Sequence, residues 1–399
     1  MMFHILEVNK FYPPHIGGIE TVVSQRAKYL SQFPDTEVKV LVCQEKGKGK
    51  TEFLNGIEII RCGSFGTYFS CPVSFSFFKE FQRLSKWADV IEFHMPFPLE
   101  DVACLLSNCQ CRIVLSWHSD IIRQKKLLFF YKPILKQFLK RADAIIAATQ
   151  GHIESSAFLP EFRQKCRVIP YPVEIPQNPV LTPILTEKLF QPSKTKLLFV
   201  GRLVYYKGVD ILIQAFRLVR NCELFLCGSG ILEPELRQLA KDLPVHFLGN
   251  LSDADLKSAF ADCDIFILPS VENSEAFGIV QQEAMLFGKP VINTNLPTGV
   301  PYVSIHQKTG LTVPPHNVKA LAQAIQKLTD SPDLRTFYGE NARKRVLESY
   351  QCKKIMQEIY QVLKNNLAKK VRCFSWMLWS LVQAVLSAAT SFRNFIIKI

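Results

Sequence analysis

The sequence lacks the features that mark disulfide-rich, zinc-binding and secreted proteins. Its twelve cysteines include no C-x-x-C pair and its eight histidines no H-x-x-x-H pair, so neither a disulfide framework nor a structural zinc site is expected. Cysteines used as small apolar residues fit a reducing cytoplasm. The first residues, Met1–Glu7, contain no basic stretch and no long apolar run, which predicts an early strand and no signal peptide.

Acidic residues are the scarcer charged class. The chain has 48 lysines and arginines against 35 aspartates and glutamates, a formal net charge of +13. This excess predicts anionic partners: nucleotides, an acidic acceptor, nucleic acid or an anionic membrane surface. The sequence contains no nucleic-acid-binding motif or aromatic platform, which disfavours nucleic acid. With 399 residues, 48% of them hydrophobic, the chain is long enough for two globular domains.

Short apolar runs alternate with helical stretches through the first half of the chain. Such alternation predicts a mostly parallel sheet with helices on both faces. The runs of strand length are Val38–Val42, Ile57–Ile60, Val90–Phe93, Ile113–Trp117, Ala144–Ala147 and Val168–Ile169.

A proline-rich segment, Tyr171–Ser193, interrupts the alternation and predicts a linker. The pattern then resumes, so we expect two doubly wound units with a cleft at the carboxyl ends of their strands, where nucleotides bind. The strands expected in the second unit are Lys196–Val200, Glu223–Cys227, Val245–Leu248, Ile265–Leu268 and Pro290–Asn293. The helices expected there are Leu203–Val219, Leu232–Ala240, Asp253–Ala261 and Phe277–Phe287.

Two segments offer groups that suit a phosphate. Gly17 and Gly18 lie between the first strand and the next helix, where backbone N–H groups and the helix dipole favour an anion; a tight turn is the alternative. Arg202 and Lys207 follow the strand Lys196–Val200 and combine a planar guanidinium with a point charge, which suits a diphosphate. A solvated basic loop is the alternative for this pair.

A third segment carries two carboxylates, Glu275 and Glu283, after the strand Ile265–Leu268. If both were helical they would lie about 12 Å apart, too far for an acid–base pair. We therefore expect them to accept hydrogen bonds from an extended ligand, one from a sugar and the other from a ribose. The amides of Phe277 and Gly278 lie where the start of a helix holds phosphate.

These segments together resemble the family 4 glycosyltransferases, from about Phe3 to Leu363. The resemblance rests on the E-x7-E element of Glu275 and Glu283, the G-R-L-x-x-x-K-G motif at Gly201–Gly208, and the Gly17-Gly18 pair. It implies the GT-B fold of two Rossmann-like domains. It also implies that Arg202 and Lys207 bind the donor diphosphate, Glu275 the transferred sugar and Glu283 the nucleotide ribose.

Two histidines follow neighbouring strands of the first unit. His118 follows Ile113–Trp117, and the resemblance implies that it contacts the donor sugar. His94 ends the preceding strand and is a weaker candidate for the acceptor side.

No D-x-D motif stands at a strand end, because Asp262 and Asp264 lie where a helix runs into a strand. We therefore expect no metal ion and no cofactor, with cationic side chains and amides stabilising the departing diphosphate. Retention of configuration, with the leaving phosphate accepting the proton of the acceptor, is what the resemblance implies.

Three further segments resemble a bacterial branch linked to mannosyl transfer in surface polysaccharide assembly. They are Trp117–Lys125, Asn295–Pro301 and Thr309–Pro315; the second departs from the Gly-Gly-Pro-Glu usual in the family. The resemblance favours GDP-mannose as the donor, with a UDP-hexose as the alternative.

Two segments favour an anionic membrane surface or a lipid-phosphate acceptor. Arg123–Arg141 contains seven basic residues, no acidic one, and interspersed aromatics; packing of its apolar residues on the sheet is the alternative. The tail 366–399 contains an uncharged run of 19 residues, Phe374–Phe392, with a polar stripe. We expect an amphipathic helix lying in the membrane interface, with a spanning helix or packing on the protein itself as alternatives.

The sequence thus predicts residues 1–175 as an acceptor-side domain, with a helix around 346–365 packing back on it. Residues 194–345 are predicted to bind the nucleotide sugar. The predicted enzyme is a retaining hexosyltransferase, cytoplasmic and peripherally attached to the inner face of the membrane, acting on a lipid-linked or glycan acceptor. A sugar-nucleotide epimerase of the same fold and a non-catalytic scaffold are the alternatives; the intact site residues disfavour the scaffold.

Overall fold

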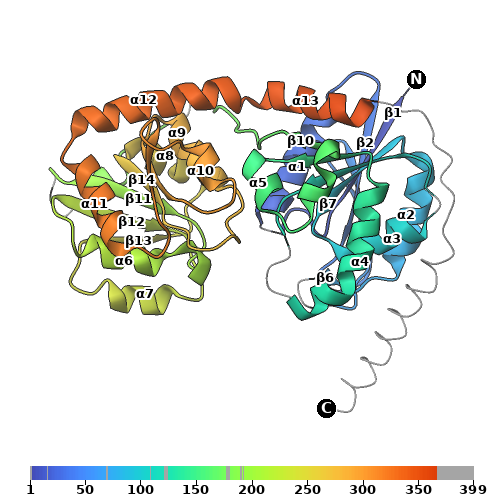
Figure 1. The fold of residues 1–399 in the computed structure, drawn as a ribbon, viewed down its shortest axis with the longest axis horizontal. Coiled ribbons are helices and arrows are strands. Elements are labelled where there is room, and N and C mark those ends of the chain that lie inside the picture. Colours follow the sequence, from blue (N-terminus) through green and yellow to red (C-terminus); the bar gives the residue numbers. More distant parts are fainter. Residues whose placement is uncertain are drawn as a thin grey trace, which may run out of the picture. The chain divides into compact units, whose positions relative to one another are not determined.

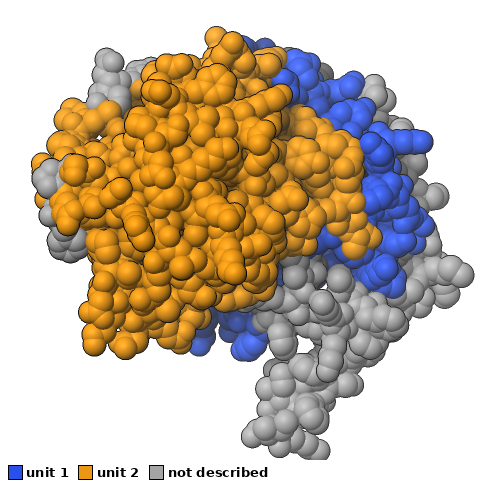
Figure 2. All heavy atoms as spheres, turned by 60° about the vertical axis from the view of Figure 1, so that its left-hand side comes forward, with its two compact units in different colours: residues 1–146, 158–167, 358–399 blue, residues 147–157, 168–357 orange. Residues whose placement is uncertain are grey.

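The protein is described from a computed structural model. The structure describes residues 2–15, 17–68, 71–107, 109–120, 125–176, 180–188, 191 and 193–365, without the side chains of 125–130. The predicted membrane tail, 366–399, and the first part of the basic segment lie outside the described residues. The chain forms two compact units (Figure 2). Unit 1 contains the described residues of 1–146, 158–167 and 358–399, and unit 2 those of 147–157 and 168–357.

Unit 1 is built on an eight-stranded sheet of order β10-β9-β8-β7-β1-β2-β4-β3. β3 pairs antiparallel with β4, whereas β1, β2, β4, β7 and β8 pair in parallel. Most residues of β1 and all of β7 are buried, and each strand carries one glutamate and one histidine among its apolar residues. The strands are β1 (Phe3–Val8), β2 (Thr36–Cys43), β3 (Lys50–Leu54), β4 (Ile57–Cys62), β7 (Val90–Met95), β8 (Arg112–Trp117), β9 (Ala144–Ala147) and β10 (Cys166–Val168).

Helices flank this sheet, and a short hairpin follows β4 (Figure 1). Tyr360 of the last helix stacks on Phe33 with ring centroids 4.1 Å apart, which fixes the end of that helix to unit 1. The hairpin strands are β5 (Thr67–Tyr68) and β6 (Cys71–Pro72). The helices are α1 (Gly18–Leu30), α2 (Ser76–Trp87), α3 (Pro98–Leu106), α4 (Lys125–Arg141), the 3-10 helix η1 (Leu159–Lys165) and α13 (Cys352–Lys364).

Unit 2 contains a six-stranded sheet of order β13-β12-β11-β14-β15-β16, in which every strand pairs in parallel. Its core is formed by residues such as Leu197, Phe199 and Ile267, all fully buried. The strands are β11 (Thr195–Val200), β12 (Cys222–Cys227), β13 (Val245–Gly249), β14 (Ile265–Leu268), β15 (Val291–Thr294) and β16 (Gly310–Val313).

The helices of unit 2 correct one prediction. The expected helix Leu203–Val219 is divided: η3 (Tyr205–Lys207) is a 3-10 turn, and α6 (Val209–Phe216) begins only after Gly208, whose φ of +65° is left-handed. Lys207 therefore lies before the helix. The other helices are α5 (Gln150–Ser155), η2 (Thr186–Lys188), α7 (Glu233–Leu239), α8 (Asp253–Asp262), α9 (Ile279–Leu286), α10 (Val300–Val303), α11 (Val318–Thr329) and α12 (Pro332–Ser349).

The unit boundaries differ from the predicted domain limits. Residues 147–157 and 168–175, predicted in the first domain, belong to unit 2, and residues 346–357 also do. The backbone explains part of this, because Val173 N–H donates to the Tyr350 carbonyl at 2.9 Å within unit 2.

Candidate functional site

In unit 2, the structure brings Lys207 and Glu275 together. Lys207 Nζ lies 2.5 Å from Glu275 Oε2, and the Ser270 hydroxyl donates to the same oxygen at 2.9 Å. The side chains of Lys207 and Glu275 are 12% and 10% exposed, so the pair is largely enclosed without being sealed. Ser270 was not predicted from the sequence; it follows β14 after Pro269 and belongs to no recognisable motif.

Two glycines allow the backbone to reach this arrangement. At Gly208 a Cβ atom would collide with the Pro269 carbonyl oxygen. Gly278 has a φ of +72° and caps α9, and a Cβ there would lie 2.5 Å from Leu268 Cδ2. Only glycine adopts these conformations at little cost, so the two positions fix the loops before α6 and α9.

Arg202 is exposed, and its guanidinium donates to the Tyr206 hydroxyl at 2.9 Å. The backbone before it is held by β12, because Gly201 N–H donates to the Cys227 carbonyl at 2.9 Å. A guanidinium held at the end of β11 can form paired hydrogen bonds with a diphosphate.

Glu283 lies in α9, whereas Glu275 lies in the preceding loop, as predicted. Burial raises the pKa of Glu283 to about 7, and the carboxylate of Asp253 adds to this increase. The start of α9 is further ordered by Gln281, whose side-chain amide donates to the Phe277 carbonyl at 3.1 Å. Phe277 itself is buried, and the prediction that its amide binds phosphate stays a prediction.

In unit 1, the structure joins the two predicted histidines to a third residue. His94 Nδ1 lies 2.9 Å from His118 Nε2, and His94 Nε2 lies 2.7 Å from Glu7 Oε2. Glu7 and His94 are fully buried and His118 is 4% exposed. Glu7 was not predicted; it lies in β1 beside β7, and only the pairing of these strands reveals the contact.

The protonation of Glu7 determines the tautomers of both rings. Burial lowers the pKa of His94 to about 3, so this ring is neutral near pH 7. Burial raises the pKa of Glu7 to about 7, although the Arg26 guanidinium opposes this increase. An ionised Glu7 accepts a hydrogen bond from the Nε2–H of His94, and Nδ1 of His94 then accepts one from the Nε2–H of His118. A protonated Glu7 donates instead and reverses both hydrogen bonds.

A buried ion pair lies beside this chain of hydrogen bonds. The Arg26 guanidinium donates to the Glu92 carboxylate and, at 2.6 Å, to the Ser116 hydroxyl. Glu7, Glu92 and His94 also lie close enough, within 4.8 Å, to hold a metal ion. Arg26 already supplies a positive charge there, so these residues form a poor cation site. The effect of EDTA on activity tests this.

At the start of α1, the carboxylate of Glu20 occupies the position that was predicted to hold an anion. Gly17 caps α1, and a Cβ there would collide with Glu20 Oε2. Glu20 is buried in the first turn, where the helix dipole favours a negative charge. A phosphate at Gly17 and Gly18 would therefore need Glu20 to move, and phosphate binding at this loop stays a prediction.

Comparison with known proteins adds family and fold. Residues 16–175 match the family model "Glycosyltransferase Family 4", and 184–345 match "Glycosyl transferases group 1". The chain is 37% identical to D-rhamnosyltransferase WbpZ of Pseudomonas aeruginosa, over 69% of this chain and 73% of that protein. It is 31% identical to O-antigen chain mannosyltransferase C of Escherichia coli, over 87% and 94% of the two chains. The chain belongs to the family 4 glycosyltransferases.

Solved structures of such enzymes have the same fold. Sucrose-phosphate synthase of Thermosynechococcus elongatus superposes with a TM-score of 0.73 at 20% identity, over 92% of this chain and all of that one. Anabaena HepE, solved with UDP and glucose, gives 0.70 at 20% identity, over 90% and 99%. The chain thus has the GT-B fold, and its family and relatives identify it as a hexosyltransferase, both as predicted.

The described part of the basic segment is partly used within unit 1. Lys136 pairs with Glu161 at 2.5 Å, and Arg141 donates to the carbonyls of Ser107 and Cys109 at 3.2 and 3.0 Å. The apolar residues Ile134, Leu135, Phe138 and Leu139 are buried. Among the described residues, no helix is long and apolar enough to cross a membrane.

Proposed function

We propose that this glycosyltransferase moves a mannosyl residue from GDP-mannose to a lipid-linked or polysaccharide acceptor during assembly of a surface glycan such as lipopolysaccharide. The observation that carries the proposal is the cluster of Lys207, Glu275 and Ser270 with Arg202 nearby in sequence, in a chain of this family. The 31% identical relative, an O-antigen chain mannosyltransferase, supports the choice of sugar and acceptor.

In the proposed reaction, Arg202 and Lys207 bind the diphosphate of the donor and stabilise the charge that develops as it departs. A preorganised donor of this kind typically lowers the barrier by about 3–4 kcal/mol. Glu275 holds both the ammonium of Lys207 and a hydroxyl of the sugar, and Glu283 accepts the ribose hydroxyls. His118, oriented through His94 by Glu7, contacts the sugar.

We propose a retaining reaction. The bond from the acceptor oxygen to the anomeric carbon forms on the face from which the phosphate departs, and the departing phosphate takes the acceptor proton. No metal ion is assigned to this step.

The test is a panel of UDP-, GDP- and ADP-sugars, including mannose and a deoxyhexose, with extracted membrane lipid as acceptor. We expect transfer from GDP-mannose that EDTA leaves unchanged, and an α-linked product from the α-linked donor. A deoxyhexose used in preference would favour rhamnosyl transfer, to which the 37% identical relative points. Loss of transfer in EDTA would contradict the metal-free reaction.

We also propose that the enzyme works at the cytoplasmic face of the membrane. The basic segment 123–141 and the tail 366–399 are the proposed contacts, and their charges suit anionic lipid. Cell fractionation of a variant lacking residues 367–399 tests the tail: an unchanged membrane-bound fraction would exclude it.

A further inference from the structure

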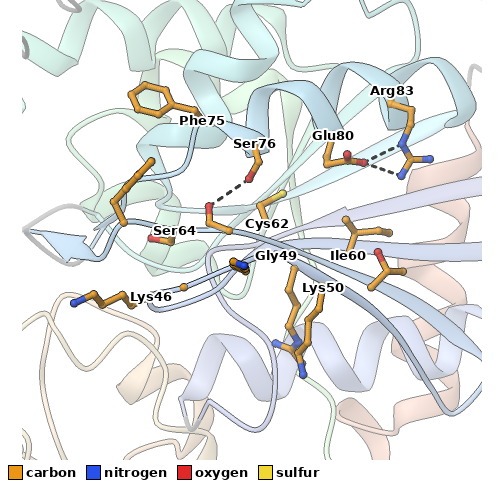
Figure 3. Close-up of a pocket in the computed structure, with 16 residues that line it drawn as sticks. Lys46, Gly49, Lys50, Ile60, Cys62, Ser64, Phe75, Ser76, Glu80 and Arg83 are labelled. Carbon is orange, nitrogen blue, oxygen red and sulfur yellow. Dashed lines mark hydrogen bonds and ion pairs between the residues drawn. The ribbon is translucent and has the colours of Figure 1, made fainter.

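Unit 1 contains a cavity of about 990 Å³ that no predicted site residue lines. It lies where β2 and β4 end, between α2 and the loop 44–49 (Figure 3). In parallel sheets, ligands bind beyond the carboxyl ends of the strands. Because β1, β7 and β8 run parallel to β2 and β4, they end at the same edge of the sheet as the cavity.

Glycines shape one wall of this cavity. Gly49 and Gly63 face each other so closely that a Cβ on Gly49 would lie 2.9 Å from the Gly63 nitrogen. Gly47 has a φ of +111° and exchanges backbone hydrogen bonds with Ser64 at 2.8 and 2.9 Å. These contacts hold the loop 44–49 against the end of β4 and give it one defined path.

The loop reads Lys46-Gly47-Lys48-Gly49 and is followed by Lys50, the first residue of β3, so three exposed lysines line the cavity. Lys50 pairs with Glu52 at 2.6 Å. Lys46 and Lys48, by contrast, form no hydrogen bond or ion pair with any residue that the structure describes. Two ammonium groups therefore remain available for an anion.

The remaining charges of the lining do not cancel this excess. Arg61 pairs with Glu52 and Arg83 with Glu80, and Glu80 is the acidic residue of the lining. Figure 3 shows Glu80 and Arg83 on α2, across the cavity from Lys46 and Lys50. Arg83 thus has its own partner and Arg61 shares Glu52 with Lys50, so the charges of Lys46 and Lys48 are left without a counter-charge among the described residues.

An aromatic pair adds an apolar rim. Phe65 and Phe75 are 66% and 69% exposed, and their rings meet edge to face at 5.8 Å. Exposed aromatic rings beside charged groups are typical of sites for ligands that are part apolar and part polar. A sugar ring joined to a phosphate has this chemistry.

We propose that this cavity binds the phosphate group of a phosphorylated glycan acceptor, with Lys46 and Lys48 on the phosphate and Phe65 and Phe75 against its sugar. This rests on the proposed function for the role of the occupant as acceptor. The binding itself does not depend on which donor the enzyme uses.

The first experiment measures binding without turnover. Calorimetry is done with inorganic pyrophosphate on an Arg202→Ala/Lys207→Ala variant, whose donor diphosphate site is disabled. We expect one site, weakened about tenfold or more by adding Lys46→Ala/Lys48→Ala, and weakened by salt. The matched control is Lys79→Ala/Lys86→Ala, which removes two exposed lysines of α2 outside the cavity lining.

The second experiment uses the enzyme with intact Arg202 and Lys207. With a glycosyl diphosphate acceptor, Lys46→Ala/Lys48→Ala should raise the acceptor KM about tenfold and leave the donor KM unchanged; with an uncharged mannose oligosaccharide it should change neither. Vesicles of phosphatidylglycerol provide a third arm. If Lys46→Ala/Lys48→Ala weakened binding to these vesicles but not to pyrophosphate, the two lysines would be assigned to a membrane surface.

Equal pyrophosphate affinity in the Lys46→Ala/Lys48→Ala and Lys79→Ala/Lys86→Ala variants would overturn the proposal. An absence of transfer from every nucleotide sugar, with pyrophosphate binding intact, would instead reject the proposed function and leave the phosphate site standing.

Discussion

The polar clusters of the two units hold their charges in opposite ways. In unit 1, Glu7, Glu92 and His94 are fully buried, and Arg26 is 2% exposed. In unit 2, Arg202 is exposed, and the Lys207–Glu275 pair keeps about a tenth of its surface in solvent. In the proposed function this difference is a division of labour: unit 2 presents charges to a ligand, whereas unit 1 uses sealed charges to orient one histidine.

The largest expected effect would come from removing the cations of unit 2. Arg202→Ala/Lys207→Ala should lower kcat/KM by about a thousandfold or more, because two preorganised donors to the diphosphate are lost. Steady-state transfer assays and thermal melting measure activity and folding separately. Transfer at the normal rate would remove both residues from the mechanism.

The next largest effect would come from breaking the buried ion pair of Arg26 and Glu92 in unit 1. Arg26→Met leaves Glu92 buried and unpaired, so the free energy of unfolding should fall by about 3–5 kcal/mol. Arg202→Met, at an exposed site, should change it by about 1 kcal/mol or less. Urea unfolding of both variants checks the contrast, and similar losses would show that burial does not distinguish the units.

A smaller effect would come from Glu7→Gln, which keeps the shape but removes the titrating group. We expect kcat to fall about tenfold. The pH profile of kcat in the native enzyme should inflect near 7, where Glu7 titrates, and the variant should lose this inflection. A purely structural Glu7 would lower the folded fraction without moving the inflection.

The smallest effect concerns the pH dependence of donor binding. The pKa of Glu283 is raised to about 7, so its carboxylate is ionised above pH 7 and protonated below. An ionised carboxylate accepts the ribose hydroxyls, and we expect the donor Kd to rise about tenfold from pH 8 to pH 6.

The matched variant is Glu283→Gln, which should show a Kd nearly independent of pH. The sign for stability is opposite: a folded-state pKa above the usual value makes the folded form relatively more stable at low pH, and this advantage is lost as pH rises towards 7. A Kd that falls on acidification would contradict the assignment of Glu283 to the ribose.

The sequence predicted the fold and the unit 2 site better than the unit 1 cluster, for a physical reason. Ile265–Leu268 was predicted with the bounds that β14 has, and the contact of Lys207 with Glu275 joins two recognisable motifs. Glu7 and Arg26 carry no motif, because their partners are set by strand pairing and helix packing between distant segments. The antiparallel edge strand β3 was missed for another reason, because its mixed polar pattern resembles that of a loop.

Arg61 links regions that the chain separates. Its guanidinium donates to Glu52 of β3 at 2.6 Å and to the carbonyls of Tyr12 and Pro13 in the loop before α1. In evolutionary terms, one side chain connects the edge strand β3, the wall of the basic cavity and the loop before α1. We therefore expect a substitution at position 61 to be accompanied by a change at position 52, whose side chain is its partner, whereas the carbonyls at 12 and 13 remain as acceptors whatever residues stand there.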